Sequence, residues 1–156
     1  PDGSEVDDFY VTTFSDAAMV FPVTKDGKIL MVRQYKAGVD DIMVEFPAGL
    51  RENDEDPTLT AIRELREETG VVAEVENLEF MGRVALLSTK ATIQVSRYFI
   101  RNVEITKNLI LDKNEEIEVL SLEPKEVLEM IENGVIYAAE SIALALQVKQ
   151  RHPDIF

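Results

Sequence analysis

Three glutamates stand close together in the segment RELREETG, residues 63–70. Glu64, Glu67 and Glu68 have the spacing i, i+3, i+4, which brings side chains to one face of an α-helix. Carboxylates this close repel one another, and the hard cations Mg²⁺ and Mn²⁺ prefer carboxylate and carbonyl oxygens. The spacing therefore has two interpretations. One is a solvated helix face on which Arg63 and Glu67 form an ordinary ion pair, and the other is a site for a divalent cation.

The residues around this segment predict a helix that begins near residue 57 and ends at residue 69. Asp56 suits an N-cap, Pro57 suits the first helical position, and Gly70 suits the C-terminal cap. The apolar side chains of this helix fall on one side of it: Leu59, Ile62 and Leu65. We expect that side to face the core, and the three glutamates to lie on nearly the opposite side.

Apolar and β-branched runs on either side of the helix predict the strands of a sheet. The expected strands span residues 16–23, 28–35, 42–49, 78–87, 93–103 and 117–122. Asp26-Gly27 between the first two strands predicts a hairpin. Pro124 opens a further helix that Gly134 ends, and a last helix is expected over residues 138–151. This order indicates a mixed-sheet α/β or α+β domain with helices packed on the sheet.

The composition limits the class of protein. A chain of 156 residues with 46% hydrophobic residues can form one domain with a sizeable core. Its net charge of −14, with no local basic cluster, argues against binding nucleic acid or an anionic membrane surface. The absence of cysteine excludes disulfides and thiolate chemistry and suits the cytoplasm. No apolar run reaches the roughly 18 residues of a membrane span, no signal peptide is visible, and a start at Pro1 leads us to expect an incomplete N-terminus.

A longer pattern around the glutamates favours the metal site. The segment GLRENDEDPTLTAIRELREETGV, residues 49–71, resembles the signature of the Nudix hydrolase family at every fixed position. With residue frequencies of ~7% for Gly or Arg and ~15% for Glu, an accidental match has odds on the order of 10⁻⁷. The resemblance implies a Nudix-type α/β/α sandwich, a mixed β-sheet flanked by helices, over residues 1–156 as a single domain. It also implies hydrolysis of a nucleoside diphosphate linked to another moiety.

The same resemblance implies roles for the residues of the signature. Glu64, Glu67 and Glu68 are the expected ligands of Mg²⁺, with Mn²⁺ as an alternative cation. The carbonyl oxygen of Ala48 is a further expected ligand. Glu64 and Glu68 are therefore expected catalytic residues, together with Arg63, which orients the carboxylates by ion pairing. Such cations screen the negative charge of a diphosphate and stabilise the leaving phosphate.

The segment VRQYKAGVDDIMVEFPAGL, residues 32–50, resembles the ADP-ribose and nucleoside-diphosphate-sugar pyrophosphatases. The resemblance implies that Arg33, Lys36 and Glu45 bind the substrate. Lys36 stands where those proteins carry a second arginine, so it keeps the charge but lacks the bidentate fork. The alternative for both cations is an ordinary surface charge at the end of a strand. Residues 86–94, LLSTKATIQ, lack the Pro-Gly pair that is usual in ADP-ribose enzymes, which leaves room for other nucleotide sugars.

The resemblance also implies a catalytic glutamate in a loop after the signature. The segment LDKNEEIEVL, residues 111–120, occupies that place in the chain. Glu115 or Glu116 is the candidate base for the attacking water, with Glu118 behind them. The alternative is a solvated acidic loop.

The predicted function is hydrolysis of the pyrophosphate bond in ADP-ribose or another nucleoside diphosphate sugar. The products are a nucleoside monophosphate and a sugar phosphate. The alternatives are a nucleoside triphosphate pyrophosphohydrolase of the same family and a non-catalytic nucleotide-sugar-binding module. A homodimer is expected from the subfamily and from the hydrophobic strand at residues 16–23. Phe9 and Tyr10 are candidates for stacking on the base, with strand packing as the alternative.

Overall fold

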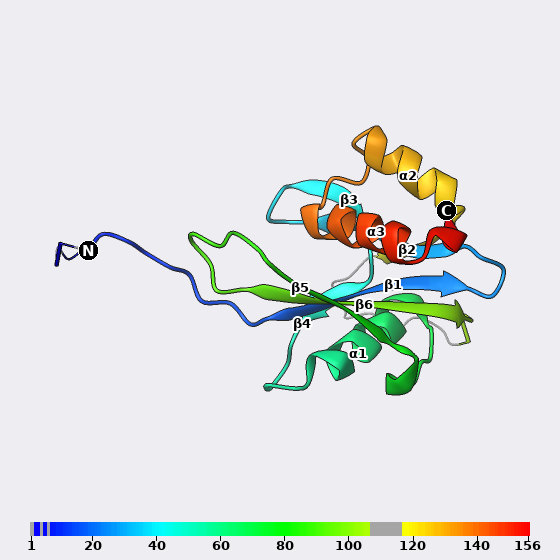
Figure 1. Cartoon of the computed structure of the whole chain (residues 1–156), viewed down its shortest axis with the longest axis horizontal. Coiled ribbons are helices and arrows are strands. Elements are labelled where there is room, and N and C mark those ends of the chain that lie inside the picture. The colour runs from blue at the N-terminus through cyan, green and yellow to red at the C-terminus, as the bar shows by residue number, and fades with distance from the viewer. Residues whose placement is uncertain (1, 4, 6, 107–116) are drawn as a thin grey trace.

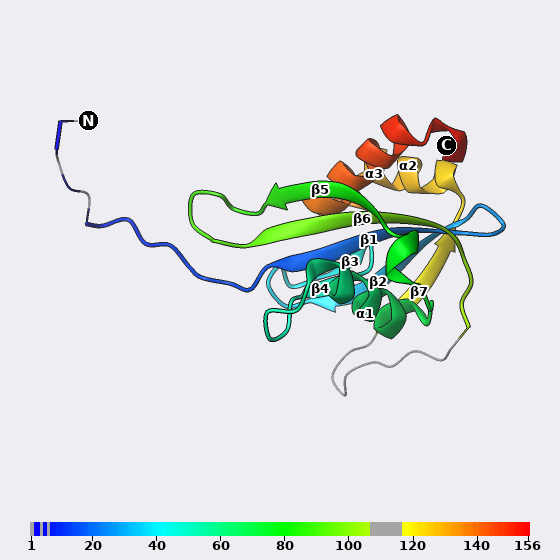
Figure 2. The same ribbon diagram turned by 60° about the horizontal axis from the view of Figure 1, so that its bottom comes forward.

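The computed structural model describes residues 2, 3, 5, 7–106 and 117–156. A mixed β-sheet lies between helix α1 (Pro57–Thr69) on one face and helices α2 (Pro124–Glu132) and α3 (Ala139–Arg151) on the other (Figures 1 and 2). The expected α/β sandwich with a mixed sheet is therefore confirmed. None of the helices in this described part is long and apolar enough to cross a membrane.

The strands follow the predicted order along the chain. They are β1 (Ala17–Thr24), β2 (Ile29–Lys36), β3 (Asp41–Glu45), β4 (Ala48–Leu50), β5 (Glu79–Ala85), β6 (Gln94–Val103) and β7 (Ile117–Leu122). Their spatial order is β3-β2-β1-β6-β5, with β4 paired to β1 and β7 paired to β2. The sheet is mixed because β1 and β6 run parallel while the other pairs run antiparallel. Single-turn 3₁₀ helices at Val75–Asn77 and Pro153–Ile155 complete the fold.

Strand β1 is the centre of the core. Its side chains alternate between the two faces of the sheet, so Met19 and Phe21 pack in the core beneath α2 and α3. Ala18 and Val20 pack on the other face, in the core shared with α1. Seven of the eight residues of β1 are buried in this way. The hydrophobicity of residues 16–23 is thus explained by the chain's own core, and it no longer supports a dimer interface.

The expected strand over residues 42–49 is divided in two. Strand β3 ends at Glu45, Phe46 and Pro47 lie between the strands, and β4 begins at Ala48. Pro47 has no N–H to donate to a ladder, so the strand breaks and the chain turns. The carbonyl of Pro47 accepts a hydrogen bond of 2.9 Å from the backbone N–H of Val20. The break allows β4 to pair with β1, which carries Ala48 to the end of α1.

Helix α1 has the predicted bounds and caps but a different buried face. The Asp56 side chain accepts a 2.8 Å hydrogen bond from the Thr58 N–H, and Gly70 ends the helix with a left-handed φ of 72°. The buried residues of the helix are Thr60, Ala61, Leu65, Glu68 and Thr69. The expected arrangement was wrong in two respects. Leu59 is 51% exposed, and Glu68 lies on the buried side, together with the small residues Thr60, Ala61 and Thr69.

Candidate active site

The three glutamates of α1 line a cleft of about 630 Å³. Its walls come from α1, from β4 and from the end of β2, which contributes Gln34 and Lys36. Successive residues of a strand point to opposite faces, so these two side chains share the face of the sheet that α1 covers. The fold therefore brings residues that are far apart in the sequence into one acidic cleft.

Glu68 is the most deeply buried carboxylate of the cleft, with 5% of its surface exposed. Its Oε2 accepts a 3.0 Å hydrogen bond from the backbone N–H of Ala48, and its Oε1 lies 3.4 Å from Gln34 Nε2. Burial raises the pKa of the Glu68 carboxyl to about 8, and the charges of Glu64 and Glu45 act in the same direction. The Ala48 N–H and the Lys36 ammonium oppose this increase in the pKa.

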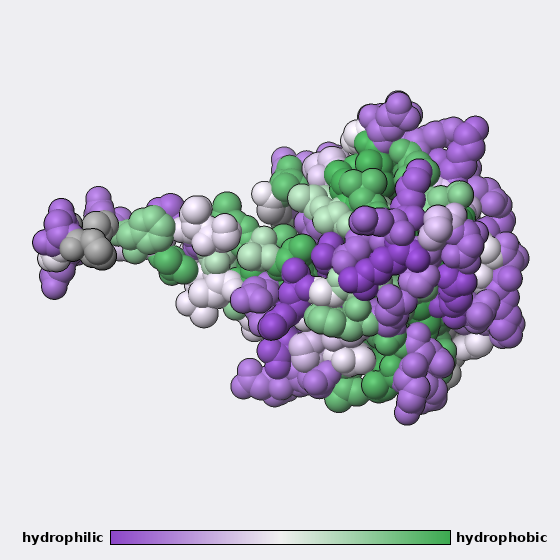
Figure 3. All heavy atoms as spheres, in the orientation of Figure 1, coloured by the Kyte–Doolittle hydropathy of each residue, from purple (hydrophilic) through white to green (hydrophobic). Residues whose placement is uncertain are grey.

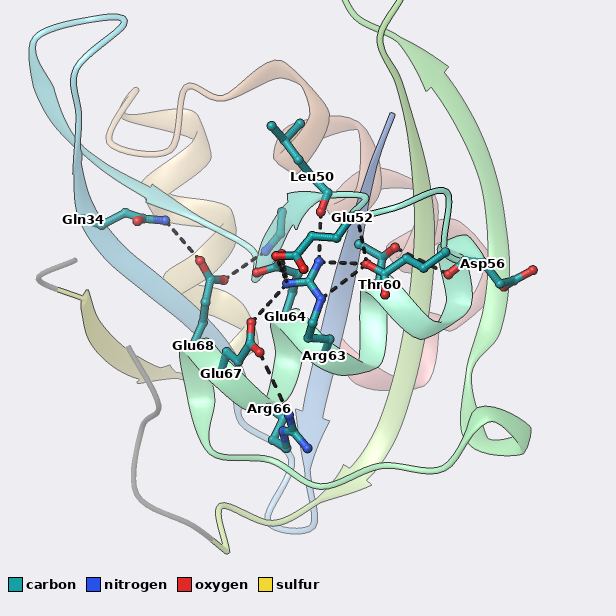
Figure 4. A network of polar contacts seen from close by, with 12 residues as sticks. Gln34, Leu50, Glu52, Asp56, Thr60, Arg63, Glu64, Arg66, Glu67 and Glu68 are labelled. Atoms are coloured by element: carbon teal, nitrogen blue, oxygen red, sulfur yellow. Dashed lines mark hydrogen bonds and ion pairs between the residues drawn. The ribbon is translucent and has the colours of Figure 1, made fainter. Parts of the chain in front are cut away.

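Arg63 holds the acidic cluster together (Figure 4). Its guanidinium lies 2.6 Å from Glu64 Oε1, 3.1 Å from Glu67 Oε2 and 2.9 Å from Glu55 Oε1. It also donates a 2.9 Å hydrogen bond to the carbonyl of Leu50 on β4. Burial disfavours the charge of Arg63, but its bonds to the carboxylates raise its pKa above the usual value, and its bond to Glu55 lowers the pKa of that carboxyl. The predicted orientation of Glu64 and Glu67 by Arg63 has a structural basis in these contacts.

The absence of a side chain at Gly49 leaves room for the Glu64 carboxylate. A Cβ atom at residue 49 would lie 2.0 Å from Glu64 Oε1 and 2.1 Å from Glu64 Cδ. Contacts this short cannot exist, so any side chain at this position would displace the carboxylate. Glycine is required here for the close approach of β4 to α1 rather than for an unusual backbone angle.

Lys36, one of the three predicted substrate-binding residues, lines the cleft, while Glu45, the second, lies beside Lys36 and is not among the lining residues. Lys36 forms an ion pair with Glu45, a carboxylate that is 6% exposed. Glu45 Oε1 also accepts a 3.0 Å hydrogen bond from Gln34 Nε2. Arg33, the third, pairs with Glu118 on β7 and is not among the residues that line the cleft, because alternation along β2 turns it to the other face. Its contact with substrate stays a prediction.

The two candidate bases cannot be placed in this site. Glu115 and Glu116 lie outside the described residues, so their predicted role stays untested. Sequence reasoning also missed Gln34, a residue of the cleft whose side chain contacts Glu68. The signal that could have found Gln34 is its place on the strand predicted over residues 28–35, two positions before Lys36. Because β2 continues through Lys36, this i, i+2 spacing puts both side chains on one face.

The donor atoms of the cleft suit a hard divalent cation. Across residues 7–106 and 117–156, no three acidic or histidine side chains are already arranged as a metal-binding cluster. Arg63 and the Ala48 N–H instead engage the three carboxylates. Yet the cleft gathers the oxygens of Glu64, Glu67 and Glu68, and burial makes the ionised form of Glu68 unfavourable. A cation with a preference for oxygen ligands would compensate that charge. The residues present therefore fit a divalent metal ion.

Comparison with known proteins identifies the family of the chain. The sequence profile of the NUDIX domain matches residues 13–144. The chain is 34% identical over 135 residues to the methanol dehydrogenase activator of Bacillus methanolicus. It is 31% identical over 138 residues to the ADP-ribose pyrophosphatase of Bacillus subtilis (strain 168). Each match covers 86% of this chain and 71% of the relative.

A solved structure described as an ADP compounds hydrolase has the same fold. It superposes with a TM-score of 0.77 and 19% sequence identity, over 89% of this chain and 73% of that one. The chain belongs to the Nudix family and is a Nudix hydrolase. Members of this family generally use divalent metal ions.

Proposed function

We propose that this protein hydrolyses the pyrophosphate bond of ADP-ribose or another nucleoside diphosphate sugar in a reaction that depends on Mg²⁺, with Mn²⁺ as an alternative. The products are a nucleoside monophosphate and a sugar phosphate. The observation that carries the proposal is the buried Glu68 carboxylate in a cleft with Glu64 and Glu67. The similarity to a protein named ADP-ribose pyrophosphatase supports the choice of substrate.

The residues of the cleft divide into two groups by their chemistry. Glu64, Glu67, Glu68 and the carbonyl of Ala48 are the proposed metal ligands. A divalent cation held there would neutralise the charge of the diphosphate and stabilise the leaving phosphate. Arg63 fixes two of these carboxylates through contacts of 2.6 and 3.1 Å.

Lys36 supplies positive charge at the other edge of the cleft. A phosphate oxygen of the substrate would pair with its ammonium group, either in place of Glu45 or together with it. Water attacks one phosphorus atom, and the bond from that atom to the bridging oxygen breaks. Glu115 or Glu116 is the proposed base that takes the proton from this water. Arg33 remains a proposed contact for the part of the substrate beyond the cleft.

We also propose that the protein is a homodimer. Residues 7–14 project from the body of the molecule and carry several exposed apolar side chains (Figures 2 and 3). The largest exposed fractions among them are 57% for Phe9 and 80% for Tyr10. The segment is fixed to the β5–β6 connection by a 2.7 Å hydrogen bond from the Thr12 N–H to the Lys90 carbonyl. A second copy that covers these side chains would remove their apolar surface from water.

A substrate screen tests the proposed specificity. ADP-ribose, GDP-mannose, UDP-glucose and a deoxynucleoside triphosphate are each incubated with the protein and Mg²⁺, and the products are separated by chromatography. We expect the highest kcat/KM for one of the three nucleotide sugars. A preference for the triphosphate would instead establish a nucleoside triphosphate pyrophosphohydrolase. Tight binding of a nucleotide sugar without turnover would establish a binding module.

A further inference from the structure

Gln34 connects the two sides of the cleft. Its Nε2 lies 3.0 Å from Glu45 Oε1. The same nitrogen lies 3.4 Å from Glu68 Oε1, and Figure 4 draws this contact. An amide nitrogen carries two N–H groups, so one side chain can donate to both carboxylates. Because the Glu45 carboxylate is ion-paired with Lys36 and only accepts hydrogen bonds, the nitrogen of the amide faces it rather than the oxygen. Glu45 is in turn paired with Lys36.

The contact with Gln34 completes the hydrogen bonding of Glu68. The Ala48 N–H donates to Oε2 of Glu68, and Gln34 faces Oε1, so each oxygen of this carboxylate has one donor of its own. Together the two donors fix the rotation of the carboxylate about its terminal bond. A carboxylate oxygen has two lone pairs, so each oxygen keeps one for a cation.

We propose that Gln34 is a positioning residue that holds the Glu68 carboxylate in its cation-binding orientation and connects it to the Lys36–Glu45 pair. The proposal rests on the proposed function, because it takes Glu68 as a metal ligand. Residues that hydrogen-bond to metal ligands typically change metal affinity or activity by about 10–100-fold when they are replaced. Gln34 therefore contributes to metal affinity without being a ligand itself.

The test measures metal binding in the absence of nucleotide. Gln34→Met keeps the length of the side chain and removes both N–H donors, and Mn²⁺ binding is followed by isothermal titration calorimetry and by the paramagnetic resonance signal of the free ion. We expect the Kd for Mn²⁺ to rise about tenfold. The matched control is Gln150→Met, because Gln150 is exposed on α3 and lies outside the cleft. This control should bind Mn²⁺ like the unaltered protein.

A second readout separates positioning from packing. In Gln34→Met the rate of hydrolysis should fall at limiting Mg²⁺ and should recover in excess Mg²⁺. The Mg²⁺ concentration that gives the half-maximal rate should change by a larger factor than the KM for the nucleotide sugar. If Gln34→Met fails to fold, Gln34→Asn is used in its place. This variant keeps the amide but shortens its reach, so we expect the same loss of affinity for Mn²⁺.

An unchanged Kd for Mn²⁺ in a folded Gln34 variant would overturn the inference, even if the unaltered protein hydrolyses nucleotide sugars. The absence of hydrolysis by the unaltered protein would instead refute the proposed function, and the Mn²⁺ titration would still decide the role of Gln34. If the unaltered protein bound no Mn²⁺ at all, both proposals would be wrong.

Discussion

At the scale of single residues, the cost of ionising the buried Glu68 carboxyl is the reason to expect a cation in the cleft. Burial raises the pKa of this carboxyl to about 8, so its ionised form is costly in the metal-free protein. Its neighbours Glu64 and Glu45 add repulsion, which the Ala48 N–H and Lys36 oppose. A bound cation would turn this unfavourable charge into an attractive one.

The first prediction concerns the stability of the metal-free protein. The pKa of Glu68 is about 8 in the folded state and near 4.5 when unfolded, so between these values the folded state holds a proton that the unfolded state has released. The stability that Glu68 contributes is therefore fully present below pH 4.5 and is lost as the pH rises through 8. Since one pKa unit corresponds to about 1.4 kcal/mol, the loss is on the order of a few kcal/mol.

Urea unfolding in EDTA at pH 5, 7 and 9 measures this loss. The free energy of unfolding should fall over this range by a larger amount in the unaltered protein than in Glu68→Gln. Glu132→Gln, on the exposed end of α2, serves as the control and should follow the unaltered protein. Parallel curves for Glu68→Gln and the unaltered protein would show that the buried carboxyl does not titrate as described.

The sequence predicted part of this residue-scale picture. The i, i+3, i+4 spacing placed Glu64, Glu67 and Glu68 near one another, because that spacing is local. It could not show that Glu68 is buried, because its burial depends on residues 48 and 34, which are 20 and 34 positions away in the chain. The role of Gln34 is hidden for the same reason.

At the scale of elements, the contact between β4 and α1 creates the site. Strand β4 brings the Ala48 N–H to Glu68 and the Leu50 carbonyl to Arg63. Gly49 lies between them and allows the close approach to Glu64. The three residues of this short strand thus contact three of the helix side chains that are proposed to act in the reaction.

The second prediction is that Gly49→Ala disables the enzyme without unfolding it. The new Cβ would displace the end of the Glu64 side chain, which is flexible, so the free energy of unfolding should change by no more than about 1–2 kcal/mol. A displacement of about 1 Å in a catalytic group can reduce the rate by about 100-fold, and we expect a loss of kcat of that order. Steady-state kinetics and thermal denaturation measure the two effects.

Gly38→Ala is the matched control for this variant. A Cβ atom at residue 38 would have no neighbouring atom within 4 Å, and the backbone there has no positive φ. A methyl group at this position should therefore leave both kcat and stability nearly unchanged. If Gly49→Ala retained the kcat of the unaltered protein, the position of Glu64 would not matter for the reaction.

Local patterns also predicted most element positions, because caps, turns and periodicity depend on neighbouring residues. Asp56, Pro57 and Gly70 gave the bounds of α1, and Asp26-Gly27 gave the β1–β2 hairpin. The parallel pairing of β1 with β6 joins residues more than 70 positions apart, and no local pattern encodes it. Helical periodicity shows which side chains share a face of the helix. It does not show whether the apolar face or a face of small residues packs on the sheet, so the exposure of Leu59 was missed.

At the scale of the whole molecule, residues 7–14 form a segment whose apolar side chains are not covered by the core of the chain. It runs beside the β5–β6 connection, where Thr12 pairs with Ala91 and Lys90 lies 4.3 Å from the centre of the Phe9 ring. Phe9 and Tyr10 remain more than half exposed in this arrangement. Their proposed stacking on the base of the substrate stays a prediction.

The third prediction is that the protein is a dimer through this segment. Size-exclusion chromatography with light scattering at micromolar concentration should give twice the mass of the chain. Tyr10→Ser combined with Phe14→Ser should shift the equilibrium toward monomer, because it removes apolar surface that the second copy would cover. Leu146→Ser, a change at a similarly exposed apolar residue on α3, is the control. A monomeric unaltered protein would refute the dimer.

The central claim is that the acidic cleft performs metal-dependent hydrolysis of a nucleotide sugar. The most direct measurement is ³¹P NMR of ADP-ribose incubated with the protein in Mg²⁺ or in EDTA. We expect AMP and ribose 5-phosphate in Mg²⁺, no products in EDTA, and a rate at least about 100-fold lower for Glu68→Gln. Equal rates with and without Mg²⁺, or full activity of Glu68→Gln, would contradict it.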